Sequence, residues 1–424
     1  MSITKLKFSN FKSFENVDVT LSNFNVLIGT NASGKSNLVK MFSFLRDIAN
    51  RNMEIAISRQ GGIEYLRNVK IGSSEELSVE LTSDKEFRFP IELKNDEYIL
   101  TRIYETNFRL SLQFTEEKPG YKISEEHIMF MCEFYDLNSE SEDIIFASKE
   151  EEGDKIGEGI IKLSNTCGKI KINVEDTGIG INGEDIIPKT ILNLIETMTK
   201  EGTTPLLDTP LAGLPVSWIS IFTDVAIYDF DPKSSKLTTK NTGNKLKENG
   251  ENLAIMLQHI KDDKENERKF LNLLRDLLPF VDDINVESFV DKQLIFLLKE
   301  KYYTEDLPAS HISDGTANIL DLILALYFEN EKFIIIEEPE RNVHPHLLSK
   351  IVQMMKETSK KKQIIVTTHN PEILKYSNNE DVYFISRNKK GFSTISKPTE
   401  KEELKFLLNE IGIEELYVDN MLGE

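Results

Sequence analysis

The chain has 424 residues but only two cysteines, one tryptophan and no apolar run long enough to cross a membrane. Cys132 and Cys167 lie far apart, without a CxxC pair or a histidine at ligand spacing. This argues against a disulfide framework and against a zinc site. The longest apolar run, residues 319–328, is shorter than the roughly 20 residues of a membrane helix and is interrupted by Asp321. We therefore expect reduced thiols and no membrane partner.

Positive charge is scarce as well. Lys and Arg number 51 against 71 Asp and Glu, which gives a net charge of −20. Such a surface repels phosphate backbones at long range, so DNA could bind only at a local basic patch or through a partner chain. The run Lys360-Lys361-Lys362 is one candidate patch. We favour a solvated helix end as its explanation, because this is the common role of short charge runs.

The N-terminal residues Met1 to Lys5 run directly into a strand pattern and do not resemble a signal peptide. With no membrane segment in the pattern, we expect a cytoplasmic protein.

Hydrophobic periodicity predicts strands over residues 3–28, where Val17, Val19 and Leu21 alternate with polar residues. Apolar residues then recur at helical spacing after Ser36, which predicts a helix with one buried face. Residues 76–175 read as an antiparallel sheet with charged turns. Residues 185–215 are mixed, with a helical stretch at 192–198, and residues 250–280 return to helix.

The last third of the chain alternates between the hydrophobic periods of helices and of strands. Residues 316–329 and 347–358 predict helices, and residues 332–336 and 363–367 predict buried strands. This order is typical of a parallel sheet with crossover helices. The tail adds a strand at 382–386 and a helix with its apolar residues on one face. Those residues are Leu404, Leu407, Leu408 and Ile411.

The fold class predicted from these patterns is α/β, a parallel sheet with helices plus an N-terminal antiparallel β lobe. No heptad pattern is long enough for an extended coiled coil. We divide the chain into residues 1–140, an inserted α+β arm at 140–225, and residues 226–424.

One motif carries a definite chemistry. Residues 29–36 match the phosphate-loop pattern in full and lie between a predicted strand and a predicted helix. Glycines let backbone N–H groups converge on phosphates, and the positive end of the helix dipole points at them. Lys35 would reach the β- and γ-phosphates of ATP, and the Ser36 hydroxyl would bind Mg²⁺. The loop consists of Gly29, Thr30, Asn31, Ala32, Ser33, Gly34, Lys35 and Ser36.

Two acids end the strand predicted at 332–336. Glu337 can hold magnesium through water, and Glu338 can orient or deprotonate an attacking water. Strands often end in solvated carboxylates with no such role. The phosphate loop upstream is what favours the functional interpretation.

Two further features fit the same site. His369 follows the next predicted strand, where it can contact the γ-phosphate, although a histidine at a strand end is usually structural. Ser313-Asp314-Gly315 precedes a predicted helix and forms either a helix cap or an anion site. These two roles are compatible.

Two other patterns match part of a functional motif but lack the rest of its context. Residues 174–183 contain Asp-x-Gly-x-Gly, but no helix follows the glycines at once, so we interpret them as a turn. His344 and His346 flank a proline without a third ligand in sight, which does not suffice for a metal site.

The set and order of these motifs resemble the ABC-type ATPases of the RecF/SMC class. More narrowly, they resemble the RecF-like and OLD-like ATPases of bacterial anti-phage systems. The opening residues 6–14 look like the N-terminal strand and turn of that class, and Asn31 and Asn37 are its characteristic asparagines. The resemblance implies an ABC-type ATPase head with a RecA-like parallel sheet. It also implies that Lys12 and Ser13 approach the nucleotide.

The same resemblance gives roles to the other motifs. Residues 312–316 resemble the signature motif, which binds the γ-phosphate of ATP held by the other subunit. Glu337 and Glu338 match the Walker B acid and the catalytic glutamate, and His369 matches the switch histidine. We therefore expect a homodimer or higher oligomer with composite ATP sites.

The sequence departs from the class in five respects. The Walker B acid is Glu337 where many relatives have Asp, and the signature is Ser-Asp-Gly, which brings an extra carboxylate near phosphate. The glutamine of the Q-loop is not evident, Gln60 being a weak candidate, and no long coiled coil is present. Only about 55 residues follow His369, too few for the nuclease domain of OLD-type proteins, so any nuclease would be a separate protein.

The expected function is an ATP-gated dimer that hydrolyses ATP with Mg²⁺, as the sensor or regulator of an anti-phage system controlling a separate effector. The alternative is a RecF-like DNA repair or maintenance ATPase, which would need a basic face. A transporter ATPase subunit is disfavoured by the strand-rich N-terminal half.

Overall fold

The computed structural model describes most of the chain, and its contacts form two compact units. The first comprises Met1–Ser22, Asn37–Val225 and Arg387–Ile395, and the second Asn23–Ser36, Ala226–Ser386 and Ser396–Glu424. The three-part division expected from the sequence stays a prediction. The described residues are 3–93, 98–137, 152–176, 178–199, 201–209, 217–237, 243–288, 293–400 and 412–418.

The second unit is built on a five-strand segment of sheet in the order β10-β14-β15-β3-β16. The contacts of β15 with β14 and β3, and of β3 with β16, are parallel. Strands β3 and β15 are buried along their whole length, as expected for a parallel sheet covered on both faces. The predicted parallel sheet is confirmed. The strands are β3 (Phe24–Ile28), β10 (Val225–Tyr228), β14 (Phe333–Glu337), β15 (Gln363–Thr368) and β16 (Val382–Arg387).

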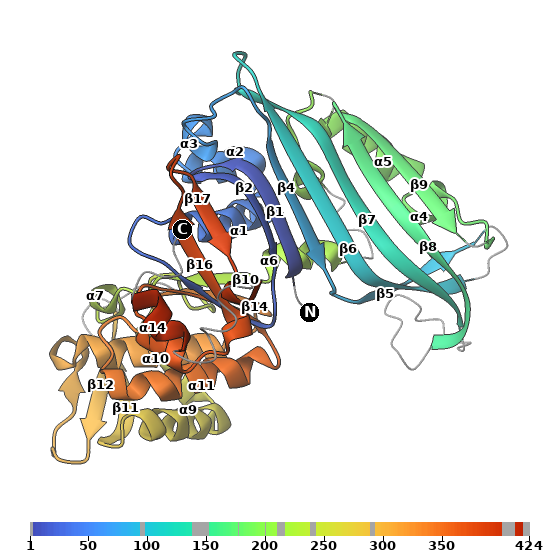
Figure 1. Cartoon of the computed structure of the whole chain (residues 1–424). Coiled ribbons are helices and arrows are strands. Elements are labelled where there is room, and N and C mark those ends of the chain that lie inside the picture. Colours follow the sequence, from blue (N-terminus) through green and yellow to red (C-terminus); the bar gives the residue numbers. More distant parts are fainter. Residues whose placement is uncertain are drawn as a thin grey trace. The chain divides into compact units, whose positions relative to one another are not determined.

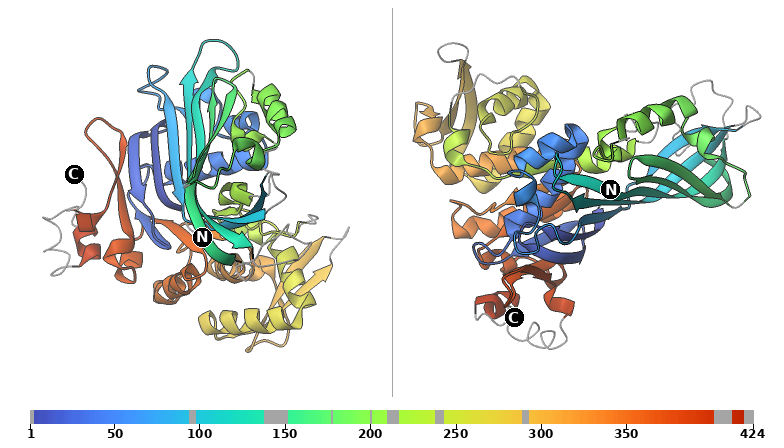
Figure 2. Two further views of the ribbon diagram at one scale, coloured as in Figure 1. Left: turned by 90° about the vertical axis from the view of Figure 1, so that its right-hand side faces the viewer. Right: turned by 90° about the horizontal axis from the view of Figure 1, so that it is seen from above.

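Helices and a small antiparallel sheet complete this unit. Helix α10 is buried over nearly its whole length, and α8 and α9 pack against the β11–β12 hairpin, drawn in yellow tones in Figure 2. The predicted helix at 404–411 lies outside the described residues. The α-helices are α7 (Pro232–Ser235), α8 (Leu253–Asp262), α9 (Lys264–Leu277), α10 (Asp314–Tyr327), α11 (Leu348–Ser359), α12 (Glu372–Lys375) and α14 (Ile413–Val418). The small sheet contains β11 (Val281–Ser288), β12 (Leu294–Glu300) and β13 (Leu307–Pro308).

The first unit is dominated by antiparallel strands in the order β17-β2-β1-β4-β6-β7-β8-β9, with β5 paired to β6. In Figure 1, β6, β7 and β8 are the long neighbouring arrows of this sheet. The antiparallel sheet predicted over 76–175 is confirmed. Its strands are β1 (Ile3–Phe11), β2 (Phe14–Thr20), β4 (Leu77–Ser83), β5 (Phe87–Glu92), β6 (Tyr98–Phe114), β7 (Tyr121–Leu137), β8 (Glu152–Thr166), β9 (Lys169–Asp176) and β17 (Ser393–Ser396).

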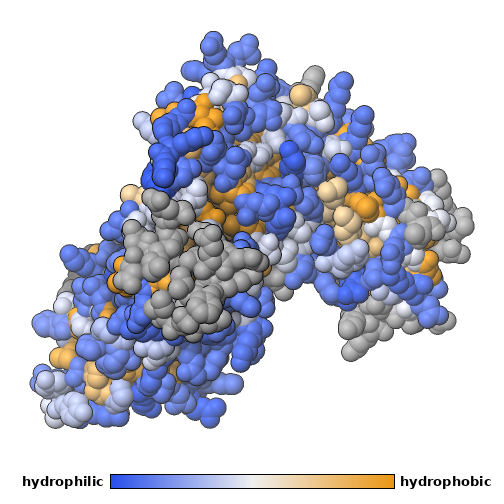
Figure 3. All heavy atoms as spheres, in the orientation of Figure 1, coloured by the Kyte–Doolittle hydropathy of each residue, from blue (hydrophilic) through white to orange (hydrophobic). Residues whose placement is uncertain are grey.

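The helices of this unit are short. The longest described helix of the chain, α1, has 16 residues, so the described residues contain no long coiled coil, as predicted. None of the described helices is both long and apolar enough for a membrane span. The face drawn in Figure 3 is mostly hydrophilic, in keeping with the acidic composition. The helices are α1 (Lys35–Asn50), α2 (Met53–Arg59), α3 (Ile63–Leu66), α4 (Gly183–Ile186), α5 (Lys189–Thr199) and α6 (Ser220–Thr223).

Candidate nucleotide site

The phosphate-loop motif lies between the buried strand β3 and the start of α1 at Lys35, as its sequence context predicts. Gly34 and Ala32 have positive φ angles of 123° and 62°, so the chain turns sharply here. A Cβ at Gly29 would lie 2.2 Å from the carbonyl oxygen of Ile385. Glycine at 29 therefore lets the loop pass directly beside β16, and glycine at 34 supplies a backbone angle that other residues rarely adopt.

Lys35 folds over this loop. Its Nζ donates to the carbonyl oxygens of Gly29 at 2.6 Å and Thr30 at 3.1 Å. Burial lowers the pKa of the Lys35 ammonium, while the nearby carboxylates Glu338, Glu340 and Glu337 oppose this shift. The lysine thus lies at the mouth of the loop. The carboxylates at and after the end of β14 are close enough to raise its pKa.

The hydroxyl of Ser36 and the carboxylate of Glu337 are in direct contact. Ser36 Oγ donates to Glu337 Oε2 at 2.7 Å, although the two residues are 301 positions apart in the sequence. The contact arises because β14 and β3 both lie beside β15 in parallel, so their carboxyl ends meet at one edge of the sheet. A hydroxyl and a carboxylate are hard oxygen ligands of the kind that Mg²⁺ prefers, so these residues fit that ion.

Glu338 has a constrained backbone. Its φ angle is 46°, and its N–H donates to the carbonyl oxygen of Thr367 at 2.8 Å. A non-glycine residue rarely adopts such an angle, and strained residues cluster at functional sites. The effect is to turn its side chain away from Glu337 and toward the end of β15.

Two groups hold the Glu338 carboxylate. His369 Nδ1 lies 2.9 Å from Oε1, and Arg341 Nη2 lies 3.3 Å from Oε2. Burial by itself raises the pKa of Glu338, but the hydrogen bonds and charges of His369 and Arg341 outweigh it and leave the pKa below its ordinary value. The carboxylate is therefore kept ionised, as a group that accepts a proton from water must be.

Arg341 was not predicted from the sequence. Its Nη1 lies 2.9 Å from Asp229 Oδ1 and donates to the carbonyl oxygen of Phe230 at 3.0 Å. Glu340 itself is buried, which raises its pKa, and it accepts a hydrogen bond from Thr368 Oγ1. The segment after the paired acids is thus anchored to both neighbouring parts of the sheet.

The Ser313 turn caps α10. Ser313 Oγ accepts a hydrogen bond from the Thr316 N–H at 3.0 Å, so the predicted helix cap is present. A Cβ at Gly315 would lie 2.4 Å from the carbonyl oxygen of Asn342, which explains the glycine. Asn318 Nδ2 donates to the carbonyl oxygens of Pro339 and Arg341 at 3.0 and 2.9 Å. The turn and residues 339–342 therefore pack as one piece.

The remaining predicted nucleotide residues lie in the first unit. Asn37 Nδ2 and Ser393 Oγ both donate to Ser13 Oγ, at 2.9 and 2.7 Å. Lys12 Nζ donates to the carbonyl oxygens of Gln60 and Tyr65 at 3.2 and 3.3 Å. Burial, with a smaller effect of Lys40, lowers the pKa of Lys12 to about 8.

Lys12, Ser13 and Asn37 share a cavity of about 410 Å³ within this unit. The described residues that line it include three further cations and no carboxylate. Such a lining suits an anion, in contrast to the net charge of the whole chain. The three cations are Arg67, Lys70 and Arg387.

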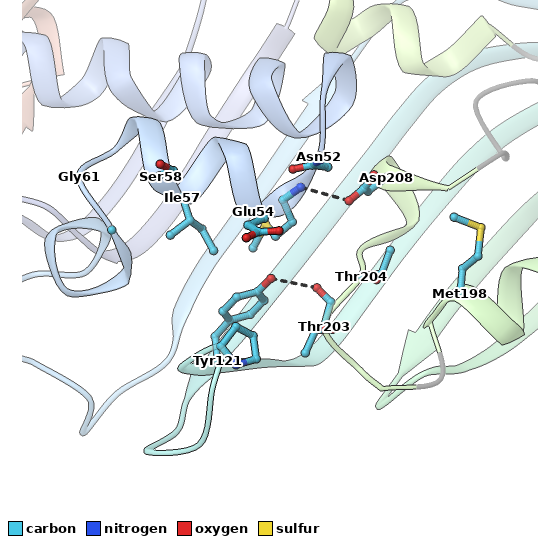
Figure 4. Close-up of a pocket in the computed structure, with 13 residues that line it drawn as sticks. Asn52, Glu54, Ile57, Ser58, Gly61, Tyr121, Met198, Thr203, Thr204 and Asp208 are labelled. Carbon is cyan, nitrogen blue, oxygen red and sulfur yellow. Dashed lines mark hydrogen bonds between the residues drawn. The ribbon is translucent and has the colours of Figure 1, made fainter.

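A larger cavity of about 870 Å³ in the first unit has the opposite character (Figure 4). It carries the carboxylates of Glu54 and Asp208, and its described lining residues include no Lys or Arg. Asp208 accepts from the N–H of Met53 at 3.1 Å, and Tyr121 OH donates to the carbonyl oxygen of Thr203 at 3.2 Å. Without a cation this cavity disfavours phosphate.

Several weaker sequence features have plain structural explanations. Lys360 is the C-cap of α11, and Lys362 donates to the carbonyl oxygen of Glu329 with its pKa lowered by burial to about 8. The interpretation as a solvated helix end therefore holds for Lys360 and Lys361, which are exposed, but not for Lys362, which is partly buried. Gln60 is buried, and its amide donates to Ser43 Oγ at 3.1 Å and to the carbonyl oxygen of Lys40.

The Asp-x-Gly-x-Gly motif and the two cysteines have simple local environments. The glycines at 178 and 180 have positive φ angles and precede the four-residue helix α4. Among the described residues, no three or more His, Cys, Asp or Glu side chains gather as a metal site. Cys132 and Cys167 are free thiols.

The fold and site together are those of a nucleotide-binding α/β protein with a phosphate loop. The family model described as "AAA domain, putative AbiEii toxin, Type IV TA system" matches residues 24–177 and 217–375, most of the chain. The chain belongs to this AAA-domain family. No curated protein matches it.

Among the solved structures that match the chain are three SMC heads. The "SmcHead bound to the C-winged helix domain of ScpA" has a TM-score of 0.44 and 14% identity, over 93% of this chain and 98% of that chain. An SMC head domain from Thermotoga maritima has a TM-score of 0.40 and 13% identity, over 94% and 99%. An Smc head with an extended coiled coil, bound to a ScpA domain derived from Pyrococcus furiosus, has 0.41 and 14%, over 96% and 98%. We draw no functional conclusion from similarities this low.

Proposed function

We propose that the chain binds and hydrolyses ATP with Mg²⁺ as an ATP-gated dimer. The observation that carries this proposal is the 2.7 Å contact between Ser36 Oγ and Glu337 Oε2 at the mouth of the phosphate loop. It joins the two motifs that an ATPase needs for its metal, and the loop lysine donates to the carbonyls beside them. Membership of an AAA-domain family supports the same assignment.

Within one subunit, the residues of the site would have separate roles in ATP binding and hydrolysis. The backbone N–H groups of residues 29–36 and Lys35 hold the phosphates, and Ser36 and Glu337 offer the ligands for Mg²⁺. When bound, Mg²⁺ neutralises charge on the β- and γ-phosphates. Glu338 accepts a proton from the water that attacks the γ-phosphorus, and ADP leaves as the bond to its β-phosphate oxygen breaks.

Hydrolysis also needs groups that respond to the γ-phosphate. His369, which contacts Glu338 in the structure, would sense that phosphate and so link its presence to the position of the base. The Ser313 turn of the second subunit would complete the site, because a capped helix N-terminus binds anions. Each ATP would then lie between the Lys35 loop of one copy and the Ser313 turn of the other.

The biological role that we propose is the sensor or regulator ATPase of an anti-phage defence system, controlling a separate effector such as a nuclease. The family description names a toxin of a type IV TA system, which is compatible with a chain that acts with a second protein. The acidic surface supports a protein partner in preference to a phosphate backbone.

A RecF-like DNA repair or maintenance ATPase is the second candidate. The cavity lined by Lys12, Arg67, Lys70 and Arg387 favours it, because it provides the local basic patch that the net charge otherwise denies. Affinity for DNA that falls steeply with salt, and that Arg67→Ala and Lys70→Ala weaken, would support this alternative. Binding that these changes leave intact would exclude this cavity as the DNA site.

The proposed function is tested with Glu338→Gln. This change removes the proton acceptor but keeps the shape of the side chain, so we expect ATP affinity within about threefold of wild type and turnover lower by about 100-fold. Light scattering after gel filtration with ATP and Mg²⁺ should then show a stable dimer that the wild type forms only transiently. Hydrolysis by Glu338→Gln at the wild-type rate would refute the assignment of the base.

A further inference from the structure

The Ser313 turn carries a carboxylate that a phosphate site has to accommodate. Asp314 is the first residue of α10, directly after the N-cap Ser313, and its side chain is 42% exposed. Carboxylates at this position stabilise a helix through its dipole. They also repel any phosphate that approaches the same N-terminus. The turn therefore needs a positive charge nearby that offsets this carboxylate.

Lys236 supplies this positive charge. Its Nζ forms an ion pair with Asp314 Oδ1 and donates to the carbonyl oxygen of Ile312 at 2.8 Å. These two acceptors lie on either side of Ser313 in the sequence, so one ammonium group spans the turn. The Lys236 side chain is only 15% exposed, which keeps the pair from exchanging freely with solvent.

A buried contact sets the position of Lys236. The preceding residue, Ser235, donates from Oγ to Asp321 Oδ2 at 2.6 Å, and both residues are fully buried. Asp321 lies on α10, two turns after Asp314, so α7 is joined to the same helix that carries the turn. A Cβ at Gly250 would lie 2.4 Å from Ser235 Oγ, which shows how closely the chain packs here.

We propose that Lys236 is a positioning residue for ATP capture between subunits. It draws the Asp314 carboxylate aside and ties down the Ile312 carbonyl, so that the Ser313 turn accepts the γ-phosphate held by a second copy. This inference rests on the proposed function and deepens it. Lys236 would act on the ATP of the partner subunit and not on the ATP held by its own phosphate loop.

The test compares steady-state ATP turnover and fluorescent ATP-analogue binding in four variants. Lys236→Met leaves the Asp314 charge unpaired, so we expect turnover to fall by about tenfold while analogue binding stays within about twofold of wild type. In Lys236→Met/Asp314→Asn the charge is gone, and turnover should return to within about threefold of wild type. Asp314→Asn alone, which keeps the shape of the residue, should give the same turnover as the double variant, because Lys236 then has no charge left to offset. Lys233→Met, on the short helix α7 that Lys236 directly follows, is the matched control and should match wild type.

Mixing establishes which subunit Lys236 serves. A Lys236→Met subunit has an intact phosphate loop, and a Lys35→Ala subunit has an intact Ser313 turn. An equimolar mixture should therefore recover about a quarter of the wild-type rate, the yield of one complete site per mixed dimer under random pairing.

Several results would overturn the inference. A double variant no more active than Lys236→Met would mean that the lysine acts through packing alone, and a mixture as inactive as its components would place its effect in its own subunit. If wild type itself neither binds nor hydrolyses ATP, the proposed function fails and the inference with it. Wild-type activity with an unchanged Lys236→Met would remove only the inference.

Discussion

The parallel sheet of the second unit and the antiparallel sheet of the first use their strand ends differently. In the second unit, β3, β14 and β15 point the same way, so the phosphate loop, the paired glutamates and His369 emerge at one edge. In the first unit successive long strands reverse direction, so the residues at their ends are divided between opposite edges. A parallel sheet therefore brings the residues at the ends of its strands together at one edge, whereas an antiparallel sheet divides them between two edges.

The two units also differ in how they hold a partly or fully buried carboxylate. Glu338 is held by a histidine and an arginine, which keep it charged. Glu126, on β7 of the first unit, is fully buried and accepts hydrogen bonds from the Leu206 N–H and the Asn165 amide. Burial raises its pKa from 4.5 to about 8. The carboxylate that is kept charged is the one we propose as the catalytic base, whereas the one that is close to neutral fixes a segment of chain.

Lys35→Ala should have the largest effect on ATP binding. A small effect would contradict the contrast between the two sheets. Removing the ammonium that faces the phosphates should weaken ATP binding by about 100-fold or more. Isothermal titration calorimetry with ATP and Mg²⁺ measures this directly. The control is Lys122→Ala on β7, an exposed lysine of the other sheet, which should change the affinity by less than about twofold. Equal effects of the two changes would show that the parallel edge is not the nucleotide site.

Arg341→Ala should have the next largest effect. It removes one of the two groups that hold Glu338 and should lower turnover by about tenfold while ATP binding is retained. Because Arg341 helps to lower the pKa of Glu338, its removal raises that pKa, and the acid limb of the kcat profile should move to higher pH.

Arg341→Lys is the matched variant, since it retains the charge and should restore most of the acid limb. A pH profile of Arg341→Ala identical to wild type would show that Arg341 does not act through Glu338.

Glu126→Gln should leave turnover unchanged and alter only stability. A carboxyl group whose pKa is raised in the folded state binds a proton that the unfolded chain releases, so its stabilisation is complete at low pH and is lost as pH rises toward about 8. Wild type should therefore lose up to about 4 kcal/mol relative to Glu126→Gln between about pH 5 and pH 8.

Urea unfolding at several pH values measures this difference. Glu125→Gln, the exposed neighbour, is the control and should follow wild type. Parallel stability curves for wild type and Glu126→Gln would mean that Glu126 is not the group responsible, and that the contrast between the two buried acids does not hold.

Much of the candidate site could be predicted because its chemistry lies in contiguous residues. The phosphate loop, Glu337 with Glu338, His369 and Ser313 were each recognised from a few neighbouring positions and their order along the chain. Arg341 and Lys236 could not be recognised in this way. An arginine after a Pro-Glu pair and a lysine after two serines have no distinctive local pattern, and their acceptors lie far from them in sequence, at Asp229 and Asp314.

The sequence by itself determined the class of fold, the family motifs and the residue types available for phosphate and magnesium. It could do so because hydrophobic period and glycine placement are local consequences of backbone geometry. Only the tertiary structure decided which carboxylate meets Ser36, which side chains hold Glu338, and how the extra charge of Asp314 is offset. The physical reason is that hydrogen bonds and ion pairs act over about 3–4 Å, and the parallel sheet brings distant segments within that range.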